Sequence, residues 1–190
     1  MDKIKEYFNN RAADWDSHSI ADAEKVEKIL KISELEENSE ILDIACGTGI
    51  MEEFLIKHNP KSILAVDIAE NMIKQAKEKY NDPRIEFLCE DVFNIKDKKF
   101  DFIIIYNAFP HFLEPEKFIS HIHSILKENG KFVICHGMGR KDLNGHHKRV
   151  ANEISLGLAP AEETASMLNG FEVKTIIDEK EIYIVYATKK

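Results

Sequence analysis

The sequence predicts an α/β fold in which one open, doubly wound, mostly parallel sheet carries helices on both faces. Strand-like apolar runs alternate with amphipathic segments along most of the 190 residues, as they do in repeated βα units. Runs such as "FIIIY" are apolar on both strand faces, which is typical of strands covered by helices on each side. The chain ends in two strand-like runs joined by a short charged turn, which indicates an antiparallel hairpin at one edge.

The expected elements follow in the order of the chain. Strands are expected at residues 40–45, 61–67, 84–89, 99–108 and 130–137, with the closing hairpin at 171–178 and 182–190. Helices are expected to begin near Gly49, Glu70 and Glu114, where the apolar spacing becomes helical. A chain of this length accommodates one sizeable core, so we expect a single domain over residues 1–190.

Two segments stand outside this alternation. Residues 1–30 read as one or two helices, and residues 138–168 as a largely helical insertion. Ligands of doubly wound sheets bind beyond the carboxyl ends of the strands. We therefore expect an N-terminal helical lid at 1–30 and an insertion over the substrate side at 138–168, with ordinary packing helices as the alternative for each.

Composition narrows the class of function. A formal net charge of −8 disfavours nucleic acid as a partner, because phosphate binding needs a basic face. No apolar run reaches the roughly 20 residues that cross a bilayer, and the charged start is no signal peptide, so we expect a cytoplasmic protein without membrane contact. Cys46, Cys89 and Cys135 lack CxxC spacing and are expected to be thiols, with Cys46 more often a space-filling residue than a reactive one.

The stretch "ILDIACGTGIMEEF", residues 41–54, contains the most informative turn. Gly47 and Gly49 match the first two glycines of a dinucleotide fingerprint, but the third position holds Glu52. A pyrophosphate would lie at this helix N-terminus beside Glu52 and Glu53, which would repel it. A cationic, phosphate-free nucleoside such as S-adenosylmethionine fits better, because Asp43 and the two glutamates do not oppose its sulfonium.

Asp67 supports a nucleoside ligand. It ends the next strand, eighteen positions after Gly49, where a carboxylate can accept both hydroxyls of a ribose. That spacing suits either cofactor, and an N-cap for the following helix is the structural alternative for Asp67.

Four motifs in chain order resemble those of class I S-adenosylmethionine-dependent methyltransferases of the small-molecule type, over nearly the whole length. They are "LDIACGTG", "AVDIAENMI", "FLCEDVFNI" and "FDFIIIYNAFPHF". The resemblance implies a Rossmann-like seven-stranded sheet with a reversed last strand, and a methyl transfer to a small-molecule acceptor that leaves S-adenosylhomocysteine. In the first motif Ala45 replaces the family's first glycine, a change we expect to be mild because alanine adds only a methyl.

The resemblance also implies roles for individual residues. The expected cofactor-binding residues are Asp43, Ala45, Gly47, Gly49, Asp67, Ile68, Met72, Asp91, Val92 and Asn107, with Asp67 on the ribose and Asp91 on the adenine amino group. The opening "YFNNRAADWD" resembles the family's cofactor-covering helix, which places Tyr7, Phe8 or Trp15 near the pocket, and we expect Tyr7 and Trp15 to contact the substrate. The oligomeric state is left open between monomer and homodimer.

Histidines gather where the acceptor is expected. Methyl transfer depends mostly on positioning, but an acceptor that arrives protonated benefits from a general base. The predicted topology brings His111, His136, His146 and His147 to the carboxyl rim, and we expect His111 and His136 to be catalytic and all four to contact substrate.

Three alternatives stay open at this point. The same four histidines, helped by Glu153, Glu162 or Glu163, suit a divalent metal that activates the acceptor. A non-catalytic S-adenosylmethionine-binding module would keep the cofactor pocket without the acceptor site. A nicotinamide-dependent oxidoreductase would bind a dinucleotide at the same turn.

Overall fold

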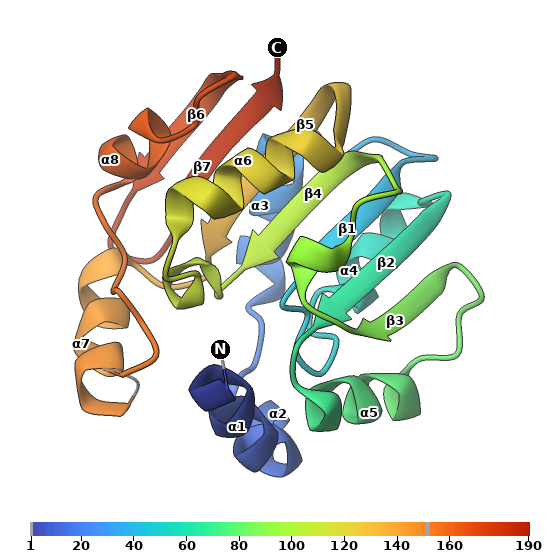
Figure 1. Cartoon of the computed structure of the whole chain (residues 1–190), viewed down its shortest axis with the longest axis vertical. Helices are drawn as coiled ribbons and strands as arrows, with labels where there is room; N and C mark the ends of the chain where they lie inside the picture. Colours follow the sequence, from blue (N-terminus) through green and yellow to red (C-terminus); the bar gives the residue numbers. More distant parts are fainter. Residues whose placement is uncertain (1, 151–152) are drawn as a thin grey trace.

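A computed structural model describes residues 2–150 and 153–190, with the side chains of residues 146–150 also outside the description (Figure 1). The described residues form one seven-stranded sheet in the order β3-β2-β1-β4-β5-β7-β6. The strands are β1 (Glu40–Ile44), β2 (Ser62–Asp67), β3 (Ile85–Cys89), β4 (Phe100–Tyr106), β5 (Leu126–His136), β6 (Phe171–Asp178) and β7 (Tyr183–Lys189). The predicted seven-stranded, doubly wound sheet is confirmed.

One strand runs against the others. β1 to β5 pair in parallel, whereas β7 inserts antiparallel between β5 and β6. The short charged turn after Asp178 lets β7 fold back at once, while each parallel pair needs a crossover through a helix. The hairpin expected at the end of the chain is therefore correct, and β7 is its reversed member.

Helices cover both faces of the sheet, as Figure 1 shows. One face packs on α6 (Pro115–Ile125) and α8 (Ala161–Ser166), and the other on α3 (Ala23–Ile32), α4 (Glu52–Leu55) and α5 (Glu70–Lys79). Each face of the sheet has its own hydrophobic core, because successive side chains of a strand point to opposite faces. In β4, Ile103 and Ile105 face the first helix layer, whereas Phe102 and Ile104 face the second.

The helix expected near Gly49 begins later. Residues 48–51 form a turn, α4 starts at Glu52, and a 3₁₀ turn (Ile56–His58) follows it. Gly47 and Gly49 adopt positive φ angles of 59° and 85°, which an α-helix does not contain. The glycine loop therefore extends to Met51, and the helix begins three residues later than the sequence predicted.

The segments expected outside the alternation are mostly helical. Residues 2–18 form α1 (Asp2–Arg11), a 3₁₀ turn and α2 (Trp15–His18), and they lie beyond the carboxyl ends of the parallel strands in Figure 1. α7 (Arg140–Val150) lies near the same end of the sheet, and α8 packs beside β6 and β7. None of the helices in the described residues is long and apolar enough to span a bilayer.

Candidate active site

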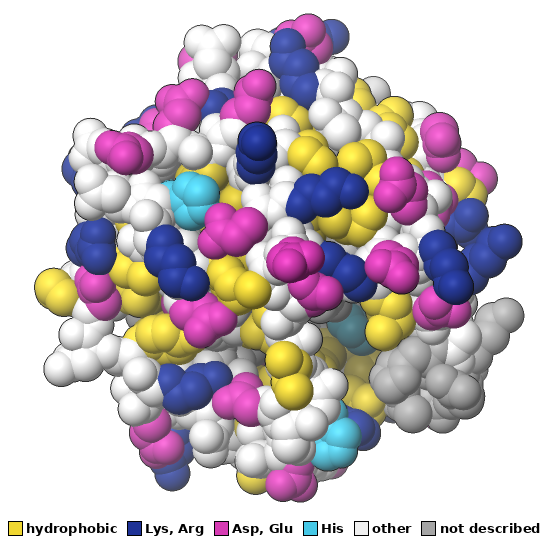
Figure 2. Space-filling view, turned by 180° about the vertical axis from the view of Figure 1, so that it is seen from behind, with side chains coloured by type: hydrophobic (Ala, Val, Ile, Leu, Met, Phe, Trp, Pro, Cys, Tyr) yellow, Lys and Arg dark blue, Asp and Glu magenta, His cyan; other side chains and the backbone are white. Residues whose placement is uncertain are grey.

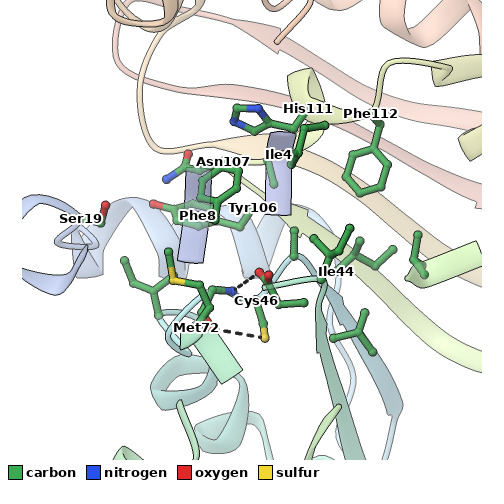
Figure 3. A pocket seen from close by; sticks show the side chains of 18 of the residues that line it. Ile4, Phe8, Ser19, Ile44, Cys46, Met72, Tyr106, Asn107, His111 and Phe112 are labelled. Atoms are coloured by element: carbon green, nitrogen blue, oxygen red, sulfur yellow. Dashed lines mark hydrogen bonds between the residues drawn. The ribbon is translucent and has the colours of Figure 1, made fainter. Parts of the chain in front are cut away.

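A cavity of about 860 Å³ opens at the carboxyl ends of the parallel strands (Figure 3). Its walls come from the ends of β1, β2 and β4, from the loops that follow them, and from residues 4–25. In a doubly wound sheet this is where ligands bind, because the crossovers diverge there and expose the strand ends. Such a volume lies near the upper end of the range of about 300–1,000 Å³ for ligand pockets.

The glycine loop forms the floor of the cavity through Ala45, Cys46 and Gly47. Ala45 has a φ of 56°, a left-handed conformation that costs an alanine about 1–2 kcal/mol. The replacement of the family's glycine is therefore more than the mild change expected from the size of a methyl group. Burial raises the pKa of the Cys46 thiol well above its usual range, which disfavours the reactive thiolate.

Gly49 does not line the cavity and has a different role from Gly47. A Cβ at Gly49 would lie 2.7 Å from Cε2 of Tyr80, and the Tyr80 hydroxyl donates to the Gly49 carbonyl over 2.6 Å. A Cβ at Gly47 would meet only Trp15 Nε1, at 3.7 Å. Gly49 thus provides a close approach for Tyr80, whereas Gly47 provides an open backbone facing the cavity.

Asp67 connects the end of β2 with the glycine loop. Its Oδ2 accepts from the Gly47 amide over 2.9 Å, and its Oδ1 accepts from the Ala69 amide over 2.8 Å. The N-cap of α5 is Ala69, so the alternative of Asp67 as that N-cap is wrong. Burial raises the pKa of Asp67 to about 6, and the carboxylate still lines the cavity where a ribose diol would donate to it.

The two glutamates after the loop do not face the cavity. Glu52 is fully buried beneath the loop next to Asp43, and Glu53 is exposed on the outer surface. Burial raises the pKa of Asp43 well above its usual range and that of Glu52 to about 7. Glu52 and Glu53 therefore do not contact a ligand in the cavity, and the prediction that they repel a pyrophosphate there is wrong. Asp43, which was predicted to bind the cofactor, does not line the cavity either.

Other predicted cofactor residues meet in one part of the cavity wall. Those that line it are Ala45, Gly47, Asp67, Ile68, Met72, Asp91, Val92 and Asn107. Ile68, Met72 and Val92 supply an apolar slot suited to a purine, and Asp91 stands at its edge, where it also caps the turn at Val92–Asn94 by accepting from the Phe93 amide. The Asn107 side chain accepts from the Gly137 amide over 3.0 Å, which connects the ends of β4 and β5.

Residues 2–18 cover the cavity with aromatic side chains and attach to its rim by polar contacts. Phe8 and Trp15 line the cavity, whereas Tyr7 stays outside it and packs edge-on against Phe8. Asp16 accepts from the hydroxyl of Thr48 in the glycine loop and pairs with Lys79 over 2.8 Å. The cover is thus attached directly to the loop that forms the floor.

His111 lies in the cavity wall at the junction of three segments (Figure 3). Its ring meets Phe8 of α1 edge to face at 5.1 Å, and its Nδ1 donates to the Ile154 carbonyl over 2.8 Å. A carbonyl accepts only, so Nδ1 carries the proton and the neutral ring has its lone pair on Nε2. Burial lowers the pKa of His111, which keeps the ring neutral at physiological pH.

His136 does not share this wall. It is fully buried at the end of β5, where it packs edge-on against Tyr183, and the cavity is lined instead by the next residue, Gly137. His146 and His147 fall among the side chains outside the description. Among the described side chains no group of three or more His, Cys, Asp or Glu residues is placed to hold a metal, and Glu153 pairs instead with Lys3 over 2.9 Å.

Several site residues escaped the sequence prediction. Tyr80, Thr48 and Asp16 secure the glycine loop, and the ends of β3 and β5 add Glu90 and Gly137 to the cavity wall. Tyr80 and Asp16 lie more than 30 residues from the partners they contact, so no local pattern marks them. Only Thr48 carried a signal, because it stands between the two glycines of the loop.

This arrangement defines a class of protein. An open loop after β1, an acidic residue at the end of β2 and an apolar slot with a carboxylate at its edge accommodate a nucleoside. The family profile described as "Methyltransferase domain" matches residues 42–134. The malonyl-[acyl-carrier protein] O-methyltransferase 2 of Ilyobacter polytropus is 30% identical over 182 residues, covering 94% of this chain and 68% of that protein.

The chain belongs to the class I S-adenosylmethionine-dependent methyltransferases. It is also 28% identical over 131 residues to a malonyl-[acyl-carrier protein] O-methyltransferase of Acetivibrio thermocellus, covering 67% of this chain and 46% of that protein. The chain spans about half the length of several such relatives. This membership removes the support for a dinucleotide-dependent oxidoreductase.

Solved structures agree on the fold. The DhpI complex with S-adenosylhomocysteine superposes with a TM-score of 0.76 at 17% identity, covering 97% of this chain and 94% of that one. The N-methyltransferase NodS from Bradyrhizobium japonicum, also with S-adenosylhomocysteine, gives 0.73 at 15% identity and covers 97% of each chain. At these identities the likeness shows the shared seven-stranded architecture.

Proposed function

We propose that this domain transfers the methyl group of S-adenosylmethionine to a small-molecule acceptor. The observation that carries the proposal is that one cavity joins the nucleoside-binding wall to the side chains of His111, Phe8 and Trp15. A volume of about 860 Å³ has room for the cofactor and a second small molecule side by side.

The chain's own residues bind and orient the two reactants. Asp67 accepts hydrogen bonds from the ribose, and Ile68, Met72 and Val92 enclose the purine. The cofactor supplies an electrophilic methyl group on a sulfonium. Holding a nucleophile in line with that methyl contributes most of the acceleration, about 7–11 kcal/mol for well-oriented reactants.

His111 takes the proton of an acceptor that arrives protonated. Its Nδ1 proton is committed to the Ile154 carbonyl, so Nε2 is the basic nitrogen, and the lowered pKa keeps it unprotonated at neutral pH. His136 has no such position, because its ring is buried against Tyr183. We therefore assign the role of base to His111 alone.

Residues 2–18 act as a lid within a single domain. Phe8 and Trp15 exclude water from the cavity and pack with Ala12 against Ala69 and Met72, while α1 itself has no buried residue and polar contacts complete the attachment. These contacts are Lys5 with Glu70, Asn9 with Asn71, and Asp16 with Thr48 and Lys79. A cover attached in this way opens at modest cost, which cofactor exchange requires.

The names of the curated relatives suggest the first acceptor to test. Malonyl thioesters present a carboxylate, which is already deprotonated at neutral pH and needs no base. A phenol, alcohol or amine needs one. The acceptor class therefore decides how strongly His111 contributes, and the two cases are separable by kinetics.

The test is a methyl-transfer assay with labelled cofactor against malonyl thioesters and panels of hydroxyl, thiol and amine acceptors. His111→Ala should lower kcat about 100- to 10,000-fold for an acceptor that loses a proton, and less than about tenfold for a carboxylate. His58→Ala, on a histidine that pairs with Glu27 and does not line the cavity, is the control. Cofactor binding with no methylated product from any acceptor class would support a non-catalytic module instead.

A further inference from the structure

A pair of buried carboxyls lies under the glycine loop and has no part in the mechanism above. Asp43, in β1, is 1% exposed and Glu52, at the start of α4, is 0% exposed. Each carboxyl shifts the pKa of the other, and the backbone amides of Met51 and Glu52 offset part of the effect of burial on Glu52. Glu53, the next residue, is exposed, so the chain provides a matched glutamate outside the pair.

The surroundings of the pair contain little positive charge. The groups that face it are Asp67 on β2, the Cys46 thiol in the loop, the Cys135 thiol on β5, and Lys79 and Tyr80 at the end of α5. Lys79 pairs with Asp16 over 2.8 Å. Among the described side chains, no cation forms an ion pair with Asp43 or Glu52.

Two adjacent buried carboxyls without a cation cannot both be ionised cheaply. Burial raises the pKa of Asp43 well above its usual range, and it raises that of Glu52 to about 7. The pair therefore holds at least one proton near neutral pH, and Glu52 is the member that titrates near pH 7.

The electrostatic influence of the pair extends to the cavity. Cys46 lines the cavity and is close enough to the pair for both carboxyls to shift the pKa of its thiol. After burial, the charges of Glu52, Asp43 and Asp67 are what raise the pKa of its thiol. Coulomb interaction is mutual, so a positive charge on a ligand in the cavity lowers the pKa of the pair.

We propose that the Asp43–Glu52 pair discriminates the cationic sulfonium of S-adenosylmethionine from the neutral thioether of the product. This inference rests on the proposed cofactor. When the sulfonium occupies the cavity, Glu52 loses its proton to solvent and the new negative charge attracts the cofactor. When the methyl has left, the positive charge is gone, a proton returns to Glu52, and the product is held less tightly.

The expected size follows from Coulomb's law. A unit charge about 10 Å away, at an effective dielectric constant of about 20, changes an equilibrium constant roughly tenfold. Between pH 6 and pH 8, the affinity of the wild-type protein for S-adenosylmethionine should therefore rise about five- to tenfold more than the affinity of Glu52→Gln does. The affinity for S-adenosylhomocysteine should change less than about twofold on the same comparison.

The experiment is isothermal titration calorimetry of the full chain with each ligand, in two buffers of different ionisation enthalpy, at pH 6, 7 and 8. Glu52→Gln keeps the shape of the side chain and removes the group that titrates near pH 7. Glu53→Gln is the matched control. The ligand's amine and the titrating groups Asp67 and His111 are common to all three proteins, so they cancel in the comparison.

We expect wild type and Glu53→Gln to release more protons on binding S-adenosylmethionine than Glu52→Gln does, and the three proteins to behave alike with the product. Equal proton release in wild type and Glu52→Gln, with both ligands bound, would overturn the inference while leaving the cofactor assignment intact. Absence of binding of either ligand to wild type would instead refute the proposed function.

A measurement on the unaltered protein covers the case in which Glu52→Gln fails to fold. Carboxyl carbon NMR of wild type should show a buried glutamate titrating near pH 7 without ligand. That titration should move to lower pH with S-adenosylmethionine, and it should move by less with the product. Equal movement with the two ligands contradicts the inference.

Discussion

Alanine substitutions at Gly47 and Gly49 should separate the two roles of the glycine loop. Both residues have positive φ, 59° at Gly47 and 85° at Gly49, so each substitution incurs the left-handed penalty of about 1–2 kcal/mol. They differ in what the new methyl meets. At Gly49 it would lie 2.7 Å from the Tyr80 ring, and at Gly47 it would lie 3.7 Å from Trp15 Nε1, an ordinary contact.

The ring of Tyr80 has little freedom to move aside. Its hydroxyl donates to the Gly49 carbonyl, and its ring packs on Phe87 with the centroids 5.9 Å apart. Overpacking of this kind costs about 1–3 kcal/mol in addition to the backbone strain. Gly49→Ala should therefore destabilise the domain by about 3 kcal/mol and Gly47→Ala by about 1 kcal/mol. For a domain of this size these values correspond to Tm losses of about 6–12 °C and 2–4 °C.

Binding should show the opposite order once stability is taken into account. The Gly47 methyl enters the space between the loop and Trp15, so Gly47→Ala should weaken S-adenosylhomocysteine binding at least about tenfold at a temperature where it is fully folded. Thermal unfolding by circular dichroism and calorimetric titration provide the two readings. In a Tyr80→Ala background, Gly49→Ala should lose the clash with the ring and keep the backbone penalty and the closer contact with Glu52 Oε2, 3.3 Å from the new methyl. An unchanged cost in that background, or equal Tm losses at the two glycines, would refute the steric reasoning.

Three further predictions follow from the same contacts. Burial raises the pKa of Glu52 from 4.5 to about 7, so between these pH values the folded state binds more protons than the unfolded state. The contribution of Glu52 to stability is therefore fully present at low pH and is lost as the pH rises from about 4.5 to 7. At about 1.4 kcal/mol per pH unit, Glu52→Gln should gain about 3 kcal/mol at pH 8 and nothing at pH 4, as read from urea unfolding at both pH values. In Asp67→Asn an NH₂ group replaces one of the two oxygens that accept a hydrogen bond from a backbone amide. This change should destabilise the domain by about 1–3 kcal/mol, and calorimetry should show S-adenosylhomocysteine binding weakened about 10- to 100-fold. Asp16→Ala removes the contacts to Thr48 and Lys79, so stopped-flow release of the product should accelerate about three- to tenfold and depend less on salt, because the Lys5–Glu70 pair remains. An unchanged release rate would show that residues 2–18 do not limit exchange.

Acidic and basic side chains are interspersed over the face shown in Figure 2. The expectation that nucleic acid is not a partner, made from the net charge of −8, stays a prediction. A filter-binding assay at low salt tests it directly, since a basic footprint would show itself as strongly salt-dependent retention.

The sequence by itself determined the architecture. Strand and helix periods are local properties, so the β-branched runs predicted the parallel strands, and the charged turn before Ile182 predicted the reversed β7. The glycine turn and Asp67 could be located in the same way, because a fixed spacing after a buried strand places both at one end of the sheet. The cofactor wall was predictable for that reason.

Only the tertiary structure decided which side chains enter the cavity. His136 and Gly137 are neighbours, but β5 ends at His136, whose ring is buried against Tyr183, whereas Gly137 begins the loop that reaches the cavity wall. Glu52 was expected beside the ligand, but the turn at residues 48–51 directs it beneath the loop against Asp43. Such placements depend on packing between elements distant in the chain, and a local pattern contains no information about that packing.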